Sequence, residues 1–368
     1  MYPATRNGCP VWPAASARAW FDVRMTDLIR WGVVATGHIA ANFVSDLALV
    51  DDAEVLAVGS RSDDTAARFA TTNHIARPYG TWEALAEDPD VDIVYVAGPH
   101  PAHYPAARLM LTAGKAVLCE KPLTLNAAQA EDLVAIAHER RVFLAEGLWT
   151  RTIPALRRIV ELVASGAIGE VTAVAADFSF ASGAGPENRL FNPALGGGAL
   201  LDVGVYPLAL AQLFLGTPDT ITGMARITDE GVDAGTGILL GYQPDREDTP
   251  PWRADSAFAT LSCAVDASGS TTATIAGTAG RIEIPAGFHH PRWFVLHRGT
   301  ETEQIDVPFE GTGLRFQAIE AMRCLRHGHI ESPLLPHSAT LTVMSTMDEV
   351  RRQIGVRYPH EAVVARTA

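Results

Sequence analysis

Residues 29–40 read Ile-Arg-Trp-Gly-Val-Val-Ala-Thr-Gly-His-Ile-Ala. The apolar run 29–35 predicts a buried strand, and the pattern of 39–49 predicts the helix that follows it. The turn between them can be compared with the dinucleotide fingerprint, which has glycine at its first two marked positions and glycine or alanine at the third. Ala35 stands at the first position, Gly37 at the second and Ala40 at the third. Gly37 leaves a bare backbone on which a pyrophosphate could sit, beside His38 and Ile39 at the helix N-terminus.

An ordinary strand–helix turn could give the same match, but the segments that follow repeat the pattern. Further buried strands are predicted at 54–59, 92–97, 116–119 and 142–145. Helices are predicted at 63–74, from Pro105 to a stop at Gly114, and at 126–137 with Asn126 as N-cap. This alternation predicts an α/β Rossmann domain with a parallel, doubly wound sheet over residues 28–148.

The character of the sequence changes beyond residue 148. A helix at 155–165 precedes an alternating strand at 172–180, and two helices are expected near the end, at 314–327 and 338–354. Further strands are predicted at 221–228, 236–242, 257–265, 271–276, 280–285 and 293–298. Residues 149–368 therefore predict an α+β domain with a large, mostly antiparallel open sheet. Residues 1–27, which contain several prolines and no periodic pattern, are expected to form a disordered extension, and Met25 is an alternative start.

Bulk composition narrows the class of protein. The 368 residues are 48% hydrophobic and 19% charged, which is typical of a globular protein with room for two cores. A formal net charge of −13 disfavours nucleic acid and anionic membranes as partners and favours a small molecule. No unbroken run of roughly 18 apolar residues predicts a transmembrane helix. The four cysteines are scattered, which favours a reduced, cytoplasmic setting.

The residues after the second strand indicate which dinucleotide is preferred. An NAD site usually has Asp or Glu there, whereas this chain has Ser60-Arg61-Ser62. A guanidinium and hydroxyl groups would bind the 2′-phosphate of NADP, so NADP(H) is the expected cofactor, with NAD possible. The alternative is that Arg61 is a solvated surface residue. Pro99 and His100, and then Glu120 and Lys121, follow later strands at the edge where such cofactors bind.

Two motifs indicate acid–base chemistry. Glu120-Lys121-Pro122 follows a buried strand, and Gly196-Gly-Gly-Ala-Leu-Leu-Asp202-Val-Gly-Val-Tyr206 places a phenol behind three glycines that allow a close approach. An ammonium beside a phenol favours the phenolate and lowers a pKa that is ordinarily near 10. We therefore expect Tyr206 to be the general acid/base, with Lys121 tuning it and polarising the substrate oxygen. Asp202 orients the lysine or a substrate hydroxyl, or simply caps a helix.

With these residues in hand, the chain from about 29 to 361 resembles the glucose–fructose oxidoreductase/inositol dehydrogenase (Gfo/Idh/MocA) superfamily. Within it, the pattern is most similar to the dimeric dihydrodiol dehydrogenases and the NADP-dependent D-xylose dehydrogenases. The resemblance implies hydride transfer between NADP(H) and a hydroxyl or carbonyl carbon of a pyranose, polyol or cyclic diol, by a homodimer joined through the C-terminal sheet. It is carried by the two motifs above and by Trp149-Thr-Arg151, Gly277-Thr-Ala-Gly280-Arg-Ile, Phe288-His289-His290-Pro291, Arg323-Cys-Leu-Arg326 and Glu331-Ser-Pro333.

The substrate contacts are expected from the resemblance and from position: His103, Trp149, Arg151 and Arg189. A buried tryptophan and a surface arginine would be the structural alternatives. His100 and His103 are three residues apart, but no third ligand completes a metal site, so no metal is expected. Two rival functions remain open. One is a carbonyl or anhydrosugar reductase, and the other is a non-catalytic dinucleotide-sensing regulator, which would have no need of Lys121 and Tyr206.

Overall fold

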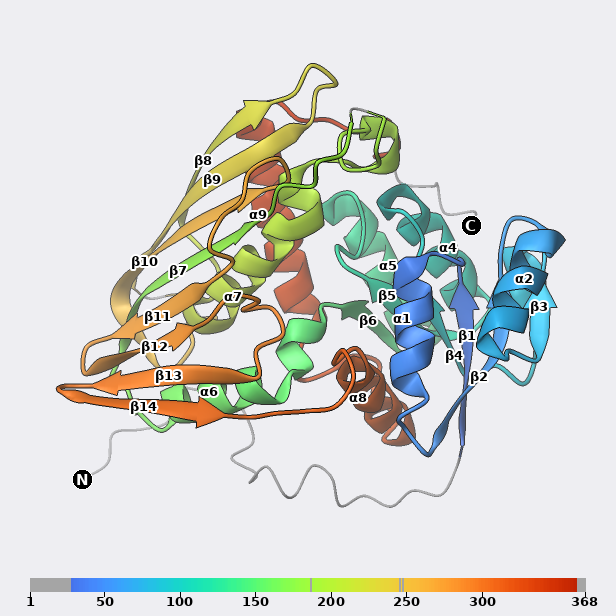
Figure 1. Ribbon diagram of the computed structural model, residues 1–368, viewed down its shortest axis with the longest axis horizontal. Helices are drawn as coiled ribbons and strands as arrows, with labels where there is room; N and C mark the ends of the chain where they lie inside the picture. The colour runs from blue at the N-terminus through green and yellow to red at the C-terminus, as the bar shows by residue number, and fades with distance from the viewer. Residues whose placement is uncertain (1–27, 186, 245, 247, 363–368) are drawn as a thin grey trace.

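The computed structural model describes residues 28–185, 187–244, 246 and 248–362. The extension predicted for residues 1–27 and the alternative start at Met25 lie outside the described residues. The described chain forms a six-stranded sheet and an eight-stranded sheet, each with helices packed on it (Figure 1). The candidate site residues of the sequence fall where these two parts meet.

The first sheet has the strand order β3-β2-β1-β4-β5-β6, and every pairing in it is parallel. The order reverses between β1 and β4, which is the switch point where doubly wound sheets bind ligands. The predicted parallel, doubly wound sheet is confirmed. Its strands are β1 (Ile29–Val34), β2 (Ala53–Gly59), β3 (Arg77–Tyr79), β4 (Ile93–Val96), β5 (Ala116–Glu120) and β6 (Leu144–Gly147).

Five helices accompany this sheet: α1 (His38–Leu47), α2 (Asp63–Asn73), α3 (Trp82–Ala86), α4 (His100–Thr112) and α5 (Ala127–Arg140). The start predicted for α4 was wrong, because the helix begins at His100 and Pro105 lies inside it. A proline favours the first turn of a helix, but Pro101 already occupies that place. The short elements β3 and α3 carry too few residues for a periodic pattern and were not predicted.

The second sheet has the order β14-β13-β12-β11-β7-β10-β9-β8, and only the pairing of β7 with β10 is parallel. The prediction of a mostly antiparallel sheet is confirmed. The edge strand β14 was missed because nearly all of it is exposed and polar, so no apolar alternation marks it. The strands are β7 (Val171–Ser179), β8 (Thr220–Ile227), β9 (Asp233–Tyr242), β10 (Arg253–Ala264), β11 (Ala273–Gly277), β12 (Gly280–Ile284), β13 (Trp293–Arg298) and β14 (Glu301–Asp306).

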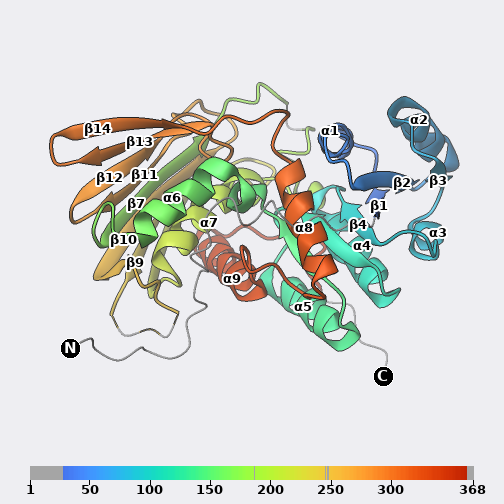
Figure 2. The same ribbon diagram turned by 90° about the horizontal axis from the view of Figure 1, so that it is seen from below.

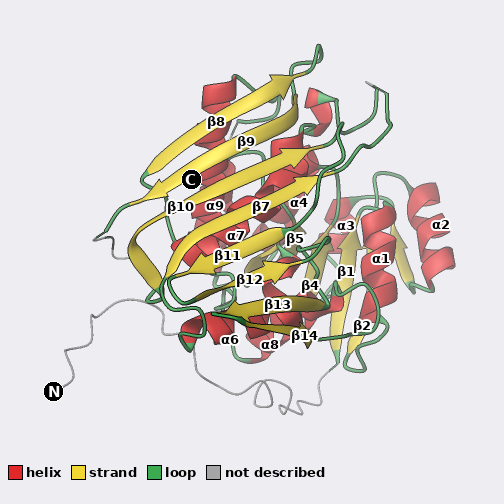
Figure 3. Cartoon of the chain, turned by 60° about the vertical axis from the view of Figure 1, so that its left-hand side comes forward, coloured by secondary structure: helices red, strands yellow, loops and turns green. Residues whose placement is uncertain are grey.

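Helices cover one face of the large sheet, and Figure 3 views the sheet from its other side. The nearly fully buried α7 packs on β7 and β10, while α9 packs on both α7 and α5 (Figure 2). The remaining helical elements are η2 (Trp149–Thr152), α6 (Pro154–Ala164), η3 (Pro193–Leu195), the π-helical turn η4 (Leu200–Gly204), α7 (Val205–Leu215), α8 (Arg315–Arg326) and α9 (His337–Ile354).

One of these helices, α8, joins the two parts of the molecule, and another, α7, is unusually apolar. α8 lies C-terminal to the predicted boundary, yet its Ala318 and Met322 pack into the same core as Trp31 of β1 and Phe43 of α1. The stretch Pro193–Leu215, which ends in α7, is long and apolar enough by composition to cross a membrane, but 94% of its apolar window is buried within the protein. That burial is what a central core helix requires.

Candidate active site

The predicted cofactor residues gather at one edge of the first sheet. Gly37 follows β1, Arg61 follows β2, Pro99 follows β4, and Lys121 follows β5. Because these strands are parallel, their carboxyl ends meet at the same edge (Figure 1). Residues separated by up to 84 positions in the sequence are thereby brought to one rim.

The N-terminus of α1 has the features of an anion site. Gly37 is its N-cap, no side chain caps it, and its first turn carries no acidic residue. A Cβ on Gly37 would meet nothing within 4 Å, so the space before these backbone N–H groups is open. A pyrophosphate therefore fits here. Ala35 adopts φ of 83°, a left-handed conformation that costs an alanine free energy and explains why the fingerprint has glycine at this position.

In the Ser60-Arg61-Ser62 segment, Arg61 is the one side chain that is free to bind a ligand. Ser60 is buried, and Ser62 caps α2 by accepting from Thr65 N over 3.3 Å. Arg61 is exposed, and among the described residues it has no hydrogen bond or ion pair. A free guanidinium at the end of β2 fits a 2′-phosphate.

The Glu120-Lys121-Pro122 corner is held in place by contacts with Tyr95 and His103. The Tyr95 hydroxyl donates to the Glu120 carboxylate over 2.5 Å, and the Lys121–Pro122 peptide is cis. His103 faces the carbonyl oxygens of Pro122, 2.8 Å from Nδ1, and of Gly98, 2.9 Å from Nε2. Because both ring nitrogens face protein atoms and the side chain is 1% exposed, His103 supports the corner. The substrate contact expected of His103 stays a prediction.

Asp202 holds Lys121 in place. The Lys121 Nζ donates to the Asp202 backbone carbonyl over 2.6 Å and lies 3.5 Å from the carboxylate Oδ1. Asp202 lies within the π-helical turn η4, a wider turn that is common at functional sites. Pro207, five residues on, has no N–H with which to return a π-type bond to that carbonyl. The lysine therefore finds an acceptor in the backbone as well as in the side chain.

The Asp202 carboxylate is surrounded by basic side chains. Arg189 Nη1 lies 3.2 Å from Oδ1, and His100 Nε2 lies 3.6 Å from the same oxygen. Burial opposes ionisation of Asp202, but Lys121, His100 and Arg189 outweigh it and hold its pKa well below the ordinary value. Burial lowers the pKa of His100 to about 3, so its imidazole is neutral. Asp202 is thus an anion that orients two cations, and it caps no helix.

Tyr206 lies next to Lys121, with the Nζ 5.2 Å from the centre of its ring. Its hydroxyl accepts a hydrogen bond from Trp149 Nε1 over 2.9 Å, which leaves its own proton for a ligand. Burial raises the pKa of Tyr206 to about 12, although Lys121 and Trp149 act to lower it. The expected net lowering was wrong, because loss of hydration outweighs one nearby ammonium in this buried site. The phenol is therefore protonated in this structure.

Arg151 does not join this cluster. Its Nη2 donates to the Ala209 carbonyl over 3.0 Å and to Gln212 Oε1 over 2.5 Å, and the side chain is buried. Glu146, another buried side chain, interacts with it electrostatically. Arg151 thus anchors α7 from within the core, and the substrate contact expected of it stays a prediction. Arg189 remains at the site, with its side chain half exposed.

The three glycines of the second motif lie so close to neighbouring protein atoms that none of them has room for a side chain. A Cβ on Gly196 would lie 2.8 Å from the Cβ of His100, and one on Gly198 would lie 2.3 Å from Asp233 Oδ1. Asp233 in turn accepts from Leu200 N over 2.7 Å, and the Tyr358 hydroxyl donates to the Gly197 carbonyl over 2.6 Å. The glycine run is therefore what lets the turn bearing Asp202 pack closely on its surroundings.

The sequence did not predict an aromatic wall that lies beside Lys121 and Tyr206. The rings of Phe178 and His289 are stacked at 4.5 Å, and those of His289 and His290 at 4.2 Å. Tyr206 lies 5.1 Å from His289, and Trp149 lies 5.3 Å from His290. Two adjacent histidines in an otherwise apolar loop were the available signal. Only the fold brings them together with β7 and η2.

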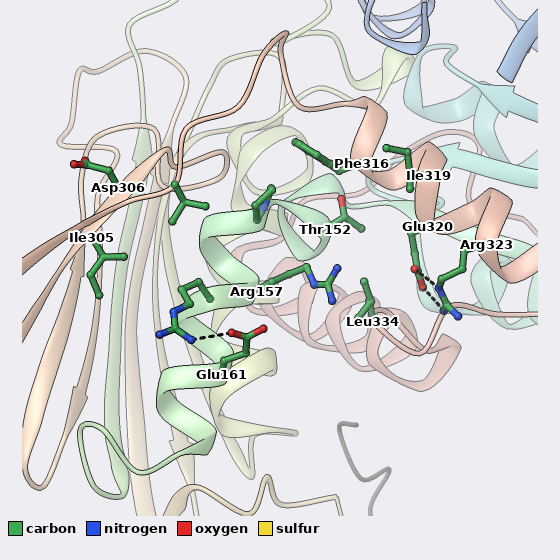
Figure 4. A pocket seen from close by; sticks show the side chains of 13 residues that line it. Thr152, Arg157, Glu161, Ile305, Asp306, Phe316, Ile319, Glu320, Arg323 and Leu334 are labelled. Atoms are coloured by element: carbon green, nitrogen blue, oxygen red, sulfur yellow. Dashed lines mark hydrogen bonds and ion pairs between the residues drawn. The ribbon is translucent and has the colours of Figure 1, made fainter. Parts of the chain in front are cut away.

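A separate cavity of about 290 Å³ lies between α6, β14 and α8 (Figure 4). Its lining contains neither Lys121 nor Tyr206, and the charged pairs drawn in it, Arg158–Glu161 and Arg323–Glu320, satisfy each other. The cluster around Lys121 and Tyr206 therefore lies outside this cavity. Within the described part of the chain, no group of three or more His, Cys, Asp or Glu side chains is placed to hold a metal.

Comparison with known families gives two matches along the chain. Residues 29–148 match the GFO/IDH/MocA oxidoreductase family with an NAD-binding Rossmann fold, and residues 156–283 match the GFO/IDH/MocA C-terminal domain. The trans-1,2-dihydrobenzene-1,2-diol dehydrogenase of Danio rerio is 36% identical over 346 residues, covering 91% of this chain and 99% of that protein. The human protein of the same name is 33% identical over 352 residues, covering 90% and 99%.

Solved structures show the same architecture. The 3-ketoreductase KijD10 of Actinomadura kijaniata, in complex with NADP and TDP-benzene, superposes with a TM-score of 0.76 at 30% identity, covering 89% of this chain and 98% of that one. The aldose-aldose oxidoreductase of Caulobacter crescentus, complexed with glycerol, has a TM-score of 0.77 at 22% identity, covering 89% and 97%. The latter likeness concerns the fold.

Proposed function

The chain belongs to the Gfo/Idh/MocA family of NAD(P)-dependent oxidoreductases, and on that premise we propose that it oxidises a ring-bearing diol or sugar with NADP. Hydride moves between the dinucleotide and a carbon that carries a hydroxyl in one state and a carbonyl in the other. The substrate class is a pyranose, polyol or cyclic diol. The similarity to dihydrodiol dehydrogenases and to an NADP-bound ketoreductase supports this class.

The chain's own residues fit the cofactor. The uncapped N-terminus of α1 and the open space at Gly37 would receive the pyrophosphate. Arg61 would bind the 2′-phosphate that distinguishes NADP from NAD. When bound, the dinucleotide supplies or accepts the hydride. The end of β4 and the Lys121 corner would border the reacting end, since all these segments share one rim.

Tyr206 exchanges the proton. For oxidation the Tyr206 phenol first loses its proton to solvent, and the phenolate oxygen then takes the proton of the substrate hydroxyl as the hydride leaves the carbon that carries it. In reduction the phenol donates its proton to the carbonyl oxygen as the carbonyl carbon receives the hydride, and solvent restores the phenol. The Trp149 indole N–H and the Lys121 ammonium stabilise the phenolate whenever it forms. Asp202 keeps Lys121 directed at this position through its carbonyl and carboxylate oxygens.

The observation that carries the proposal is the juxtaposition of Lys121 and Tyr206 at the cofactor rim, with the phenol proton uncommitted. The test is an absorbance assay at the NADPH band with NADP or NAD and a panel of pyranoses, inositols and trans-dihydrodiols. NADP-dependent turnover that falls by about a hundredfold or more in Tyr206→Phe would support it. Turnover unchanged in that variant would show that another group exchanges the proton.

A second candidate is the reverse reaction, carbonyl reduction. The raised pKa of Tyr206, at about 12, keeps the phenol protonated at neutral pH and suits it to donate a proton. If NADPH-dependent reduction of ketosugars greatly exceeds oxidation at pH 7, the protein works as a reductase. A non-catalytic regulator would instead bind cofactor and turn over neither set.

We also propose a homodimer formed through the outer face of the large sheet. That face has no helix on it in the described chain (Figure 3), and it exposes Met224, Leu239 and Phe258 to 77%, 51% and 51%. Apolar side chains gathered on an uncovered sheet mark an interface. Leu239→Lys should convert a dimer into a monomer, as measured by light scattering, and a wild-type monomer at micromolar concentration would exclude the dimer.

The described cysteines are all unpaired, which supports a reducing, cytoplasmic setting.

A further inference from the structure

The loop between β12 and β13 presents an imidazole to the catalytic tyrosine. It is fixed at several points: Phe288 is fully buried, Thr150 Oγ1 donates to the His289 carbonyl over 2.7 Å, and His290 Nδ1 lies 2.9 Å from the Gly287 carbonyl. Gly287 has φ of 83°, a turn conformation that favours glycine. The position of His289 is therefore built into the loop.

Stacking leaves only the edge of the His289 ring for polar contacts. Phe178 stacks on it at 4.5 Å with an interplanar angle of 23°, and His290 stacks at 4.2 Å with an angle of 12°. Two nearly parallel rings cannot share one face of an imidazole at those distances, so they cover opposite faces. The two ring nitrogens lie on the remaining edge, and the Tyr206 ring is 5.1 Å away.

His289 carries a polar atom that the protein does not satisfy. Nδ1 is buried and has no hydrogen-bond partner among the described residues. Burial lowers the pKa of His289 to about 3, helped by His290 and by the Lys121 ammonium, so the ring is neutral and has one donor and one acceptor. Leaving a buried polar atom unpaired is costly. Nε2 has no hydrogen bond among the described residues either and, unlike Nδ1, is not closed off from solvent. It is therefore the ring nitrogen that a substrate beside Tyr206 would bond.

We propose that His289 hydrogen-bonds a second hydroxyl, on the carbon next to the one oxidised, and so selects vicinal diols and sugars over simple alcohols. This rests on the proposed function, since Tyr206 must hold the first hydroxyl. Two hydroxyls on adjacent carbons reach neighbouring groups of a site, and the centres of the Tyr206 and His289 rings lie 5.1 Å apart. The flat faces of Phe178 and Trp149 would bound the substrate ring. A site built to bond a hydroxyl discriminates strongly against an analogue that lacks it.

The test compares matched substrate pairs: trans-cyclohexane-1,2-diol with cyclohexanol, and D-glucose with 2-deoxy-D-glucose, each with NADP. In His289→Phe, which keeps a stacking ring, the ratio of kcat/KM within a pair should fall by about tenfold or more. His289→Gln, which keeps a donor and an acceptor, should recover part of that ratio and also serves if the phenylalanine variant does not fold. His290→Phe is the matched control, with the ratio expected within about twofold of the wild type.

The results of these assays distinguish a failure of the role proposed for His289 from a failure of the proposed oxidoreductase activity. A ratio unchanged in His289→Phe, or one that falls equally in His290→Phe, overturns the role of His289 and leaves the oxidoreductase activity standing. If the wild type turns over neither member of a pair, calorimetric titration of the NADPH-loaded enzyme with the diol decides. Diol binding that His289→Phe weakens supports the inference although the proposed reaction fails. Absence of diol binding to the wild type overturns both.

Discussion

Trp149 offers a direct test of how the buried tyrosine is made reactive. Its Nε1–H donates to the Tyr206 hydroxyl over 2.9 Å, a bond that favours the phenolate and lowers the pKa of Tyr206. In Trp149→Phe an aromatic side chain remains and the donor is lost. The phenolate that forms during oxidation then lacks one of its two stabilising partners. We expect oxidation to slow, because the rising limb of its pH profile is displaced to higher pH.

The size of the effect follows from the type of bond. A hydrogen bond to a charged group contributes about 1.5–3 kcal/mol. At 1.36 kcal/mol for each factor of ten, this corresponds to a roughly 10- to 150-fold loss of kcat/KM for oxidation. The same free energy should move the rising limb of the pH profile upward by about one to two pH units. Reduction needs the phenol in its protonated form, so it should lose less.

The assay is NADP-dependent oxidation of a turned-over substrate between pH 6 and 10, with kcat/KM measured at each pH. Trp252→Phe is the control, because Trp252 Nε1 also donates a hydrogen bond, to the Phe214 carbonyl over 3.2 Å, but away from Tyr206. The control should leave the shape of the profile unchanged. The pKa of Tyr206, at about 12, lies above this range, so the loss should be similar at each pH, and NADPH-dependent reduction is measured alongside. An equal loss in oxidation and in reduction would refute the reasoning, since it would show that Trp149 acts by packing alone.

Three further substitutions test other parts of the structure. Arg61→Ala should raise the KM for NADP about tenfold or more through loss of a charge-assisted hydrogen bond, and equal effects on the KM for NAD would exclude contact with the 2′-phosphate. Ala35→Gly should stabilise the fold by about 0.5–1 kcal/mol, measured by urea unfolding, because φ of 83° strains alanine by more than glycine loses in entropy. Burial raises the pKa of Glu146 to about 7 from an ordinary 4.5, so the folded state binds the extra proton and stability falls as pH rises between those values, by roughly 3 kcal/mol at most. Glu146→Gln should remove that fall, and parallel pH–stability curves for the two proteins would contradict it.

Local sequence patterns predicted those parts of the fold that local physics determines. Buried parallel strands are continuous apolar runs, and the turn at Gly37 and the corner at Lys121 are contiguous motifs, so all were visible in the sequence. The edge strand β14 was not, because an exposed polar strand has no apolar period. The wall formed by Phe178 and His289 joins residues 111 positions apart and required the folded chain.

Protonation at the site was the least predictable property, because it depends on burial. The sequence shows an ammonium near a phenol, which alone would favour the phenolate. The fold adds two opposing effects: it removes water from Tyr206, and it pairs Lys121 with Asp202, whose negative charge also disfavours the phenolate.

Lys121 and Arg189 are both cations paired with the Asp202 carboxylate, so these three side chains together carry one net positive charge before proton transfer. Formation of the phenolate brings the charge of the cluster to zero. The site is therefore arranged to accept a transient anion on Tyr206 without storing one at rest, which suits a group that must both take and return a proton.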